Sequence, residues 1–409
     1  MKRPELLSPA GNFEKMKAAI LYGADAVYLA GRRFGMRAAA DNFDIDELRC
    51  AVEYAHERDV KVYLTVNTMP REYDYPALQE YFTELKSIRP DALIIGDIGV
   101  MALAREMLPE VDIHVSTQAN SLSSAAVRAW VALGAKRVVL SRELTLDEIK
   151  EIRRSVPDEV ELECFVHGSM CISYSGRCLL SAHMIGRDAN MGACAQPCRW
   201  NYTIRGYEIT EEKRPECKMS IEEHGGETFV MASRDTCTIE HIPELVEAGI
   251  DSFKIEGRMK SAYYTAVVTN TYKMALDSYF GGNYSYDPRW YRELESVSHR
   301  EYATGYYFKD SKTDANLDTA GGYIKDKAYL AVCLGYDERS GEALMEQRNK
   351  MTVEDRVEYL TPGSVGREIS FDALFDEEHN EIDATRHPYM RFYMRTPVKL
   401  KAGDILRAL

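Results

Sequence analysis

The first 280 residues repeat one pattern, in which a short β-rich run is followed by an amphipathic helical stretch, and this repetition constrains the fold more than any other feature. Such an alternation places parallel strands side by side with helices outside them, either in an open doubly wound sheet or in a closed barrel. The β-rich runs are residues 5–8, 26–30, 61–67, 92–97, 113–118, 137–142, 160–167 and 252–258.

The number of runs favours the closed form. Eight strand–helix units close a TIM-like barrel, and the sequence has no Gly-x-Gly-x-x-Gly after its first strand, the phosphate-binding turn that many open sheets carry. We therefore predict an α/β fold whose main domain, residues 1–283, is a (β/α)8 TIM-like barrel.

Two regions fall outside the repeat. Residues 168–251 separate the seventh and eighth runs, which is far more than a strand-to-helix loop needs, and they predict a Cys-rich insertion. Its place after strand seven is the carboxyl rim of the barrel, where barrel enzymes carry their active sites. After residue 325, short alternating runs such as 329–334 and 390–394 predict a small β-barrel domain over 326–409, joined by a connector at 284–325.

The chain is acidic, with 51 Lys and Arg residues against 65 Asp and Glu and a formal net charge of −14. A surface of this sign repels polyanions, so any nucleic-acid site has to be local. Residues 167–206 hold four Arg and one Asp, and residues 386–407 interleave basic and aromatic side chains, as RNA-binding surfaces do. No apolar run is long enough to span a membrane and the start is not typical of an export signal, so we expect a cytoplasmic protein.

Cysteines are concentrated in the insertion and the strand before it, since seven of the nine lie between residues 164 and 237. The odd total without an export signal argues against a disulfide framework and for thiols that bind a metal. The spacing does not match a zinc ribbon, so zinc and an iron–sulfur cluster both stay open on spacing alone. The predicted ligands are Cys171, Cys178, Cys194 and Cys198, with Cys237 or Cys217 as alternatives for one of the four.

Polar residues stand where the predicted strands end. Because the carboxyl ends of parallel strands meet at one rim of a barrel, these side chains predict a polar pocket. They are Asn67, Asp97, Gln118, Arg142, His167, Glu256 and Arg258, together with Arg37 and Asn42 after the second strand.

The insertion opens with a specific signature. Residues 163–181, Glu-Cys-Phe-Val-His-Gly-Ser-Met-Cys-Ile-Ser-Tyr-Ser-Gly-Arg-Cys-Leu-Leu-Ser, closely resemble the signature of the collagenase-like peptidase family, which is peptidase family U, number 32. The resemblance covers the whole chain, and its further motifs stand at residues 5–11, 37–43, 116–118, 192–200 and 254–260.

The resemblance implies an activity. The family carries an old protease label, while several members are oxygen-independent hydroxylases of RNA or of ubiquinone precursors. This chain most resembles the branch that hydroxylates tRNA, forming 5-hydroxyuridine at the wobble position of the anticodon with prephenate as the oxygen source. Hydroxylases of the family hold a 4Fe–4S cluster. The motifs place that cluster on Cys171, Cys178 and Cys194, with Cys198, Cys237 or Cys217 as the fourth ligand.

On this interpretation the polar residues divide by role. The catalytic candidates, which would hold a small anionic oxygen donor, orient the base or handle protons, are His167, Arg142, Arg258 and Glu256. The candidates for binding the tRNA substrate are Asn67, Gln118, Arg37, Asn42, Arg177 and Arg199.

Two other functions compete with hydroxylation. A collagenase-like peptidase would need a nucleophile, a base and an orienting group. The sequence offers only Ser169 or Cys171 beside His167, and no His-Glu-x-x-His motif. A non-catalytic RNA-binding protein with a structural zinc would need four closed cysteine ligands and no polar pocket at the rim.

Overall fold

The computed structural model divides the chain into two compact units. The barrel unit consists of Met1–Phe13, Asp25–Met259 and His299–Ile324, and the sheet unit consists of Glu14–Ala24, Lys260–Ser298 and Lys325–Leu409. The structure describes residues 2–36, 41–171, 173–174, 178, 180–199, 209–211, 214–219, 222–224, 227–229, 233–282, 284–309, 324 and 327–409.

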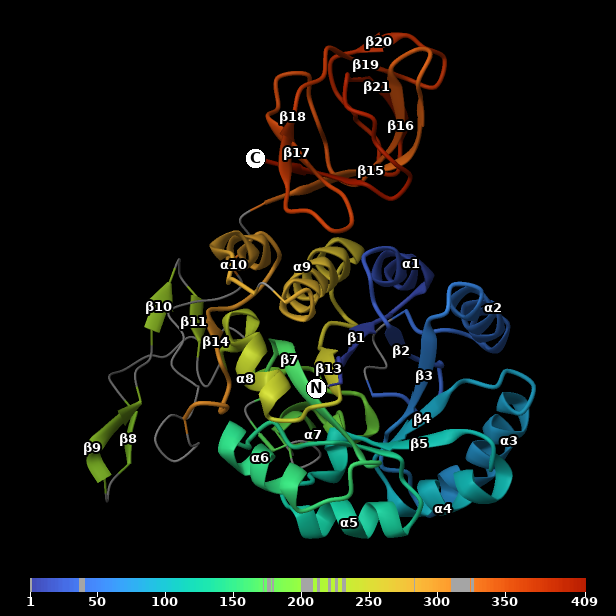
Figure 1. The fold of residues 1–409 in the computed structure, drawn as a ribbon, viewed down its shortest axis with the longest axis vertical. Coiled ribbons are helices and arrows are strands. Elements are labelled where there is room, and N and C mark those ends of the chain that lie inside the picture. Colours follow the sequence, from blue (N-terminus) through green and yellow to red (C-terminus); the bar gives the residue numbers. More distant parts are fainter. Residues whose placement is uncertain are drawn as a thin grey trace. The chain divides into compact units, whose positions relative to one another are not determined.

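Eight parallel strands form a closed ring in the barrel unit (Figure 1). Neighbouring strands pair in chain order from the first to the seventh, and the eighth pairs with both the seventh and the first. This confirms the predicted TIM-like barrel, since an open sheet would leave two edge strands. The strands are β1 (Glu5–Pro9), β2 (Ala26–Ala30), β3 (Lys61–Val66), β4 (Ala92–Ile95), β5 (Asp112–Val115), β6 (Arg137–Val139), β7 (Glu161–Ser169) and β13 (Ser252–Ile255).

Helices follow the strands, and α2 (Ile45–His56) shows why they form. Asp44 caps its start in a reciprocal pair with Glu47. Its buried residues recur at helical spacing and are Leu48, Ala51, Val52 and Ala55. Within the described ranges, no helix combines the length and the apolar character that crossing a membrane requires. Further helices of the barrel unit are α3 (Tyr75–Leu85), α4 (Ile98–Met107), α5 (Ser124–Ala132), α6 (Leu146–Arg154), α7 (Leu180–Ile185) and α8 (Ile242–Glu247).

Strand β7 has nine residues and continues past its barrel neighbours. Its last residues pair antiparallel with β12 (Asp235–Cys237), which itself pairs with β14 (Tyr302–Ala303). The insertion therefore starts from a supported strand and not from a free loop. Between β7 and β12 it contains α7 and two hairpins, β8 (Ile209–Glu211) with β9 (Arg214–Met219) and β10 (Glu222–His224) with β11 (Glu227–Phe229).

The sheet unit contains an antiparallel sheet whose core includes Met345, Phe392 and Leu406. The sheet curls around this core, which confirms the predicted C-terminal β-domain. Helices α1 (Phe13–Leu21, from its second residue), α9 (Ala262–Phe280) and α10 (Pro288–Glu295) belong to the same unit. In spatial order the strands are β18 (Arg367–Ile369), β17 (Val357–Leu360), β22 (Ile405–Ala408), β15 (Tyr329–Asp337), β16 (Glu342–Gln347), β21 (Arg391–Arg395), β19 (Ala373–Phe375) and β20 (Glu381–Ile382).

A buried ion pair joins this sheet to helix α10. Arg407 on β22 is 2% exposed and donates to the two carboxylate oxygens of Glu293 at 2.7 and 2.8 Å. It also donates to Glu358 on β17 at 2.9 Å. The sheet thus packs on helices that precede residue 325 in the sequence. The predicted domain bounds 1–283, 284–325 and 326–409 are drawn from the order of the elements along the sequence, and they stay predictions.

Replacing Arg407 with Ala tests this ion pair. The change leaves the Glu293 carboxylate buried without its cation, and breaking a buried pair from one side destabilises a protein by about 3–5 kcal/mol. We expect a loss of this size in the free energy of unfolding, measured by urea denaturation. Arg356→Ala is the control, because Arg356 pairs with Glu368 at the surface, where an ion pair contributes at most about 1 kcal/mol. Equal losses in the two variants would contradict the prediction.

Candidate active site at the carboxyl rim of the barrel

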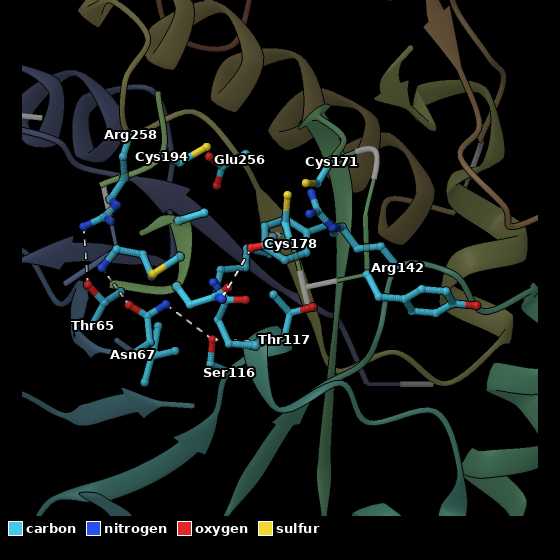
Figure 2. A pocket seen from close by; sticks show the side chains of 18 of the residues that line it. Thr65, Asn67, Ser116, Thr117, Arg142, Cys171, Cys178, Cys194, Glu256 and Arg258 are labelled. Atoms are coloured by element: carbon cyan, nitrogen blue, oxygen red, sulfur yellow. Dashed lines mark hydrogen bonds between the residues drawn. The ribbon is translucent and has the colours of Figure 1, made fainter. Parts of the chain in front are cut away.

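A cavity of about 140 Å³ lies at the carboxyl ends of the barrel strands. Residues of the barrel strands themselves form its floor, and they are Tyr28, Thr65, Ile94, Phe165 and Lys254. The insertion and the loops that follow the strands form its remaining walls, as the side chains in Figure 2 show. The predicted rim pocket therefore exists, and it is built from both the barrel and the insertion.

Four cysteines of the insertion line this one cavity. They carry free thiols, are partly exposed, and are Cys171, Cys178, Cys194 and Cys198. Cys237 is 6% exposed within β12 and is not among the lining residues. The side chain of Cys217 lies outside the described residues. Placement therefore favours Cys198 over Cys237 as the fourth member of the predicted set.

The four thiols are the ligand type that iron–sulfur clusters take, and all four line one cavity. Figure 2 shows Cys171 and Cys178 on one side of the cavity and Cys194 on the other. In the described part of the chain, no three Cys, His, Asp or Glu side chains are grouped closely enough to hold a metal ion. The Sγ of Cys194 accepts the backbone N–H of Gln196 at 3.3 Å, a hydrogen bond of the kind that tunes cluster thiolates. Cluster ligation stays a prediction that the donor set supports.

Five of the polar residues predicted at the strand ends also line the cavity, and these are Asn67, Gln118, Arg142, Glu256 and Arg258. Asn67 is held in place, because its Oδ1 accepts the N–H of Met36 at 3.0 Å and its Nδ2 donates to the Ser116 hydroxyl at 3.4 Å. Arg258 is 3% exposed and donates to the Thr65 hydroxyl at 3.3 Å. Both side chains thus have a defined orientation at the cavity wall.

Glu256 is the carboxylate in the wall of this cavity. Its Oε2 accepts a hydrogen bond from the Tyr28 hydroxyl at 3.1 Å, and Tyr28 also donates to the backbone carbonyl of Ile255 at 2.9 Å. Tyr28 therefore fixes the end of β13 and the side chain that follows it. A carboxylate held in this way can accept or release a proton at a defined position.

Gln118 and Arg142 each present a buried polar atom that has no hydrogen-bond partner among the described residues. These atoms are the Oε1 acceptor of Gln118 and the Nε donor of Arg142. Arg142 is otherwise held, since its Nη1 donates to the Ser169 carbonyl at 3.0 Å and its guanidinium lies 5.2 Å from the centre of the Phe165 ring. Both residues line the cavity, so we take these two atoms as candidate contacts for a ligand.

Lys254 is a cavity residue that the sequence did not single out. Its Nζ donates to Glu163 at 2.7 Å and lies 4.7 Å from the centre of the Tyr28 ring. Glu163 is fully buried and also accepts from Arg137 at 3.1 Å. Burial alone would raise the pKa of Glu163, but Lys254 and Arg137 outweigh it and hold that pKa below its usual range. The available signal was strand alternation, which puts Lys254 on the same face as Glu256.

His167 does not line the cavity, although alternation along β7 predicts that it faces the same way as Phe165. The pairing of β7 with β13 shifts register between Lys254 and Ile255, so His167 lies opposite Ile255. A shift of one residue turns a side chain to the other face of a sheet. His167 is 1% exposed, and its Nε2 lies 3.4 Å from the Tyr302 hydroxyl. Its catalytic role stays a prediction that this placement does not support.

Asn42 and Asp97, the other predicted residues that the structure describes, do not line the cavity. Asn42 is 8% exposed in the loop after β2, where its N–H donates to the carbonyl of Gly11 at 3.2 Å. Asp97 caps α4 by accepting the N–H of Gly99 at 2.9 Å. Arg37, Arg177 and the side chain of Arg199 lie outside the described residues, so their roles stay predictions.

The basic run near the C-terminus is largely neutralised by nearby carboxylates. Its aromatic Phe392 belongs to the core of the sheet, whereas Tyr389 is 66% exposed. This run therefore does not form an unbalanced positive patch for RNA. The ion pairs are Arg386 with Asp383, Arg391 with Glu346, Arg395 with Glu342 and Lys399 with Glu338.

Comparison with known proteins identifies the family. The profile of Peptidase family U32 matches residues 11–317, and that of the Peptidase family U32 C-terminal domain matches residues 325–407. The chain belongs to peptidase family U32. The match confirms the resemblance that the signature at residues 163–181 carries.

The U32 relatives of this chain have names that refer to different activities. The chain is 36% identical to tRNA hydroxylation protein P1 of Bacillus subtilis over 99% of its own length and 95% of that protein. It is 32% identical to a collagenase of Porphyromonas gingivalis, over 84% of this chain and 82% of that protein. It is 36% identical to a 23S rRNA 5-hydroxycytidine synthase of Escherichia coli, over 68% of this chain and 40% of that protein.

The lowered pKa of Glu163 makes its contribution to stability depend on pH. A carboxylate whose pKa is lower in the folded state stabilises the protein above its ordinary pKa, about 4.3, and loses this effect as the pH falls through the folded value. We expect Glu163→Gln to lower the free energy of unfolding at pH 7 by about 3–5 kcal/mol. The difference from the wild type should shrink below about pH 4. Urea denaturation at pH 7 and at about pH 3.5, on either side of the ordinary pKa of glutamate, checks both statements. A difference between variant and wild type that does not change with pH would contradict the expected pH dependence.

Proposed function

We propose that this U32 protein is a tRNA hydroxylase that converts the wobble uridine of an anticodon to 5-hydroxyuridine, with prephenate as the oxygen source and a 4Fe–4S cluster as cofactor. Similarity over nearly the full length to a tRNA hydroxylation protein supports the RNA substrate. The observation that carries the proposal is the cavity, which four thiols line together with amide, guanidinium and ammonium groups.

The amide side chains are suited to reading a uracil. A uracil presents one N–H donor between two carbonyl acceptors, and the unpartnered Oε1 of Gln118 is a buried acceptor for such a donor. Asn67 adds a second amide at the same wall. The base has to leave its stack to reach them, as in other enzymes that act on a base. We assign base recognition to Gln118 and Asn67.

The cations of the cavity are suited to a small anion with carboxylates. Lys254, Arg142 and Arg258 line the cavity together with one carboxylate, Glu256. The charge of Lys254 is already balanced by Glu163, whereas the Nε of Arg142 has no partner among the described residues. Guanidinium groups bind carboxylates through paired hydrogen bonds. Arg142 is therefore the group that we assign to the oxygen donor.

The proton released from C5 of the base needs an acceptor. In the proposed step a C5–O bond forms as the C–O bond of the oxygen donor breaks, the donor keeps that electron pair and is reduced, and the C5 hydrogen leaves as a proton that can finally reach the donor carbon. Glu256 is a lining carboxylate, already oriented by Tyr28, that can accept this proton. Cys171, Cys178, Cys194 and Cys198 would hold the cluster, which supplies electron-transfer or Lewis-acid chemistry when bound. The proton acceptor and the cluster ligands thus belong to one cavity.

The peptidase alternative lacks an assembled catalytic couple in the described residues. Cys171 lines the cavity, whereas His167 of β7 is buried, does not line the cavity and contacts Tyr302. Ser169 offers its backbone carbonyl to Arg142, and β12 covers its strand. A nucleophile and its base have to lie within hydrogen-bond reach of each other. No feature of this arrangement favours peptide cleavage over hydroxylation.

Replacing Cys171 with Ala tests the function in cells. We expect 5-hydroxyuridine nucleosides to disappear from the tRNA of a deletion strain, to return with the wild-type gene, and to stay absent with Cys171→Ala. Cys50→Ala is the matched control, because Cys50 is an exposed thiol on α2, away from the cavity lining, and should restore the modification fully. Mass spectrometry of digested tRNA measures the outcome. Unchanged nucleosides in the deletion strain, together with gelatin cleavage by the pure protein, would favour the peptidase.

Replacing Arg142 with Lys tests the anion site. Lysine keeps the charge but loses the planar fork, so we expect the KM for prephenate to rise about tenfold, which corresponds to about 1.4 kcal/mol. The measurement is steady-state kinetics of the anaerobically reconstituted enzyme on tRNA. Arg128→Lys is the control, since Arg128 is exposed and also donates to a serine carbonyl, that of Ser155 at 2.8 Å. A KM that both variants leave unchanged would remove Arg142 from the proposed site.

A further inference from the structure

The peptide that precedes Cys171 is held by side chains from two distant segments. The carbonyl of Met170 accepts a hydrogen bond from the Ser233 hydroxyl at 2.6 Å and another from the Arg300 guanidinium at 3.3 Å. Met170, Ser233 and Arg300 are 3%, 4% and 2% exposed. A buried carbonyl with two side-chain donors is firmly anchored, because a buried polar group without its partner is destabilising.

Arg300 is itself fixed by a buried ion pair with Asp235. Its Nε and Nη2 donate to Oδ1 of Asp235 at 2.9 and 2.6 Å, and its backbone N–H donates to Oδ2 at 3.1 Å. Its Nη1 reaches the Ser233 hydroxyl at 3.3 Å. The guanidinium therefore contacts Asp235, Ser233 and Met170 at once, and lysine lacks the planar fork to do the same.

These contacts secure the end of β7 on its buried side. Asp235 lies opposite Ser169 in the pairing of β12 with β7, and its N–H donates to the carbonyl of Glu301 at 3.0 Å. From the cavity, Arg142 donates to the carbonyl of Ser169 at 3.0 Å. The two residues before Cys171 are thus held from the interior of the protein and from the cavity.

We propose that Arg300, Asp235 and Ser233 form a clamp that positions the Cys171 thiol at the cavity. The clamp deepens the proposed function, on which it rests only in taking Cys171 as a cluster ligand. Arg300 acts through the Met170 carbonyl and is a positioning residue. Contacts that orient a metal ligand typically change metal affinity by about 10–100-fold when removed. A buried ion pair, by contrast, is weak support for stability as such.

The other end of the same strand offers a matched control. Arg153 pairs with Asp251 at 3.2 Å and donates to the backbone carbonyl of Val160 at 2.8 Å. Asp251 accepts the N–H of Leu162 at 2.9 Å. This pair also joins an arginine, an aspartate and the backbone of β7, but it lies at the start of the strand. Arg153→Lys therefore reproduces the chemical change without touching the cysteine.

The experiment compares Arg300→Lys with Arg153→Lys by cysteine alkylation. Each metal-free protein is exposed to iodoacetamide, and peptide mass spectrometry follows the rate at Cys171 relative to Cys194. We expect Arg300→Lys to raise this ratio several-fold, because the released thiol samples more exposed positions, and Arg153→Lys to leave it unchanged. Ser233→Ala removes one hydrogen bond to Met170 and should raise the ratio less. It serves as the test if Arg300→Lys does not fold.

Reconstitution with iron and sulfide provides a second measurement. We expect Arg300→Lys to lose iron to a chelator about tenfold faster than the wild type, and Arg153→Lys to match the wild type. An unchanged alkylation ratio in both Arg300→Lys and Ser233→Ala would overturn the clamp, even if the two variants were less stable than the wild type. A wild type that takes up no iron would instead overturn the proposed cluster, while the alkylation ratio would still decide the clamp.

Discussion

Glu163 lies fully buried inside the barrel between Lys254 of β13 and Arg137 of β6. Arg137 in turn donates to Glu5 of β1 at 2.6 Å, so charged groups bridge strands on both sides of the point where β13 closes the ring. Barrel interiors usually hold branched aliphatic residues. Here ions fill part of that space, and each is tolerated only with its partners in place. The ion pair that joins β7 to β13 at the closure of the barrel therefore also holds Lys254 at the cavity floor.

Strand β7 connects this network to the chemistry at the rim. It carries Glu163 in the network and Phe165 in the cavity floor, and it ends two residues before Cys171. Pairing with β12 supports the last residues of β7, which extend beyond the barrel. A functional group on a supported strand is more precisely placed than one on a free loop. Cys171 belongs to the insertion, but it follows directly on a strand that is anchored in the barrel interior.

What could be predicted from the sequence is what local patterns encode. Strand–helix alternation predicts the closed barrel, and polar residues at strand ends surround one cavity because parallel strands share a rim. The placement of His167 away from the cavity and the ion pair of Lys254 with Glu163 escape prediction for a common reason. The register shift opposite Ile255 arises in the pairing of β7 with β13, and the ion pair of Lys254 with Glu163 joins the same two strands. The two residues of this ion pair are 91 positions apart in the sequence. Neither contact leaves a trace in the local pattern. The packing of α9 and α10 with the C-terminal sheet is likewise a long-range outcome.

Under the proposed function, net charge and access to the cavity together bear on which form of RNA can react. The chain carries a net charge of −14, and the cations of the 386–407 run that form ion pairs face carboxylates, so that run adds little attraction for a polyanion. Cations outnumber carboxylates in the cavity lining, where Arg142, Lys254 and Arg258 stand against Glu256. A duplex cannot bring its stacked bases into such a space, whereas an unstacked nucleotide of a loop can enter it. Under the proposed function, the acidic surface weakens non-specific binding of RNA, and entry into the cavity selects an unstacked nucleotide of a single-stranded loop.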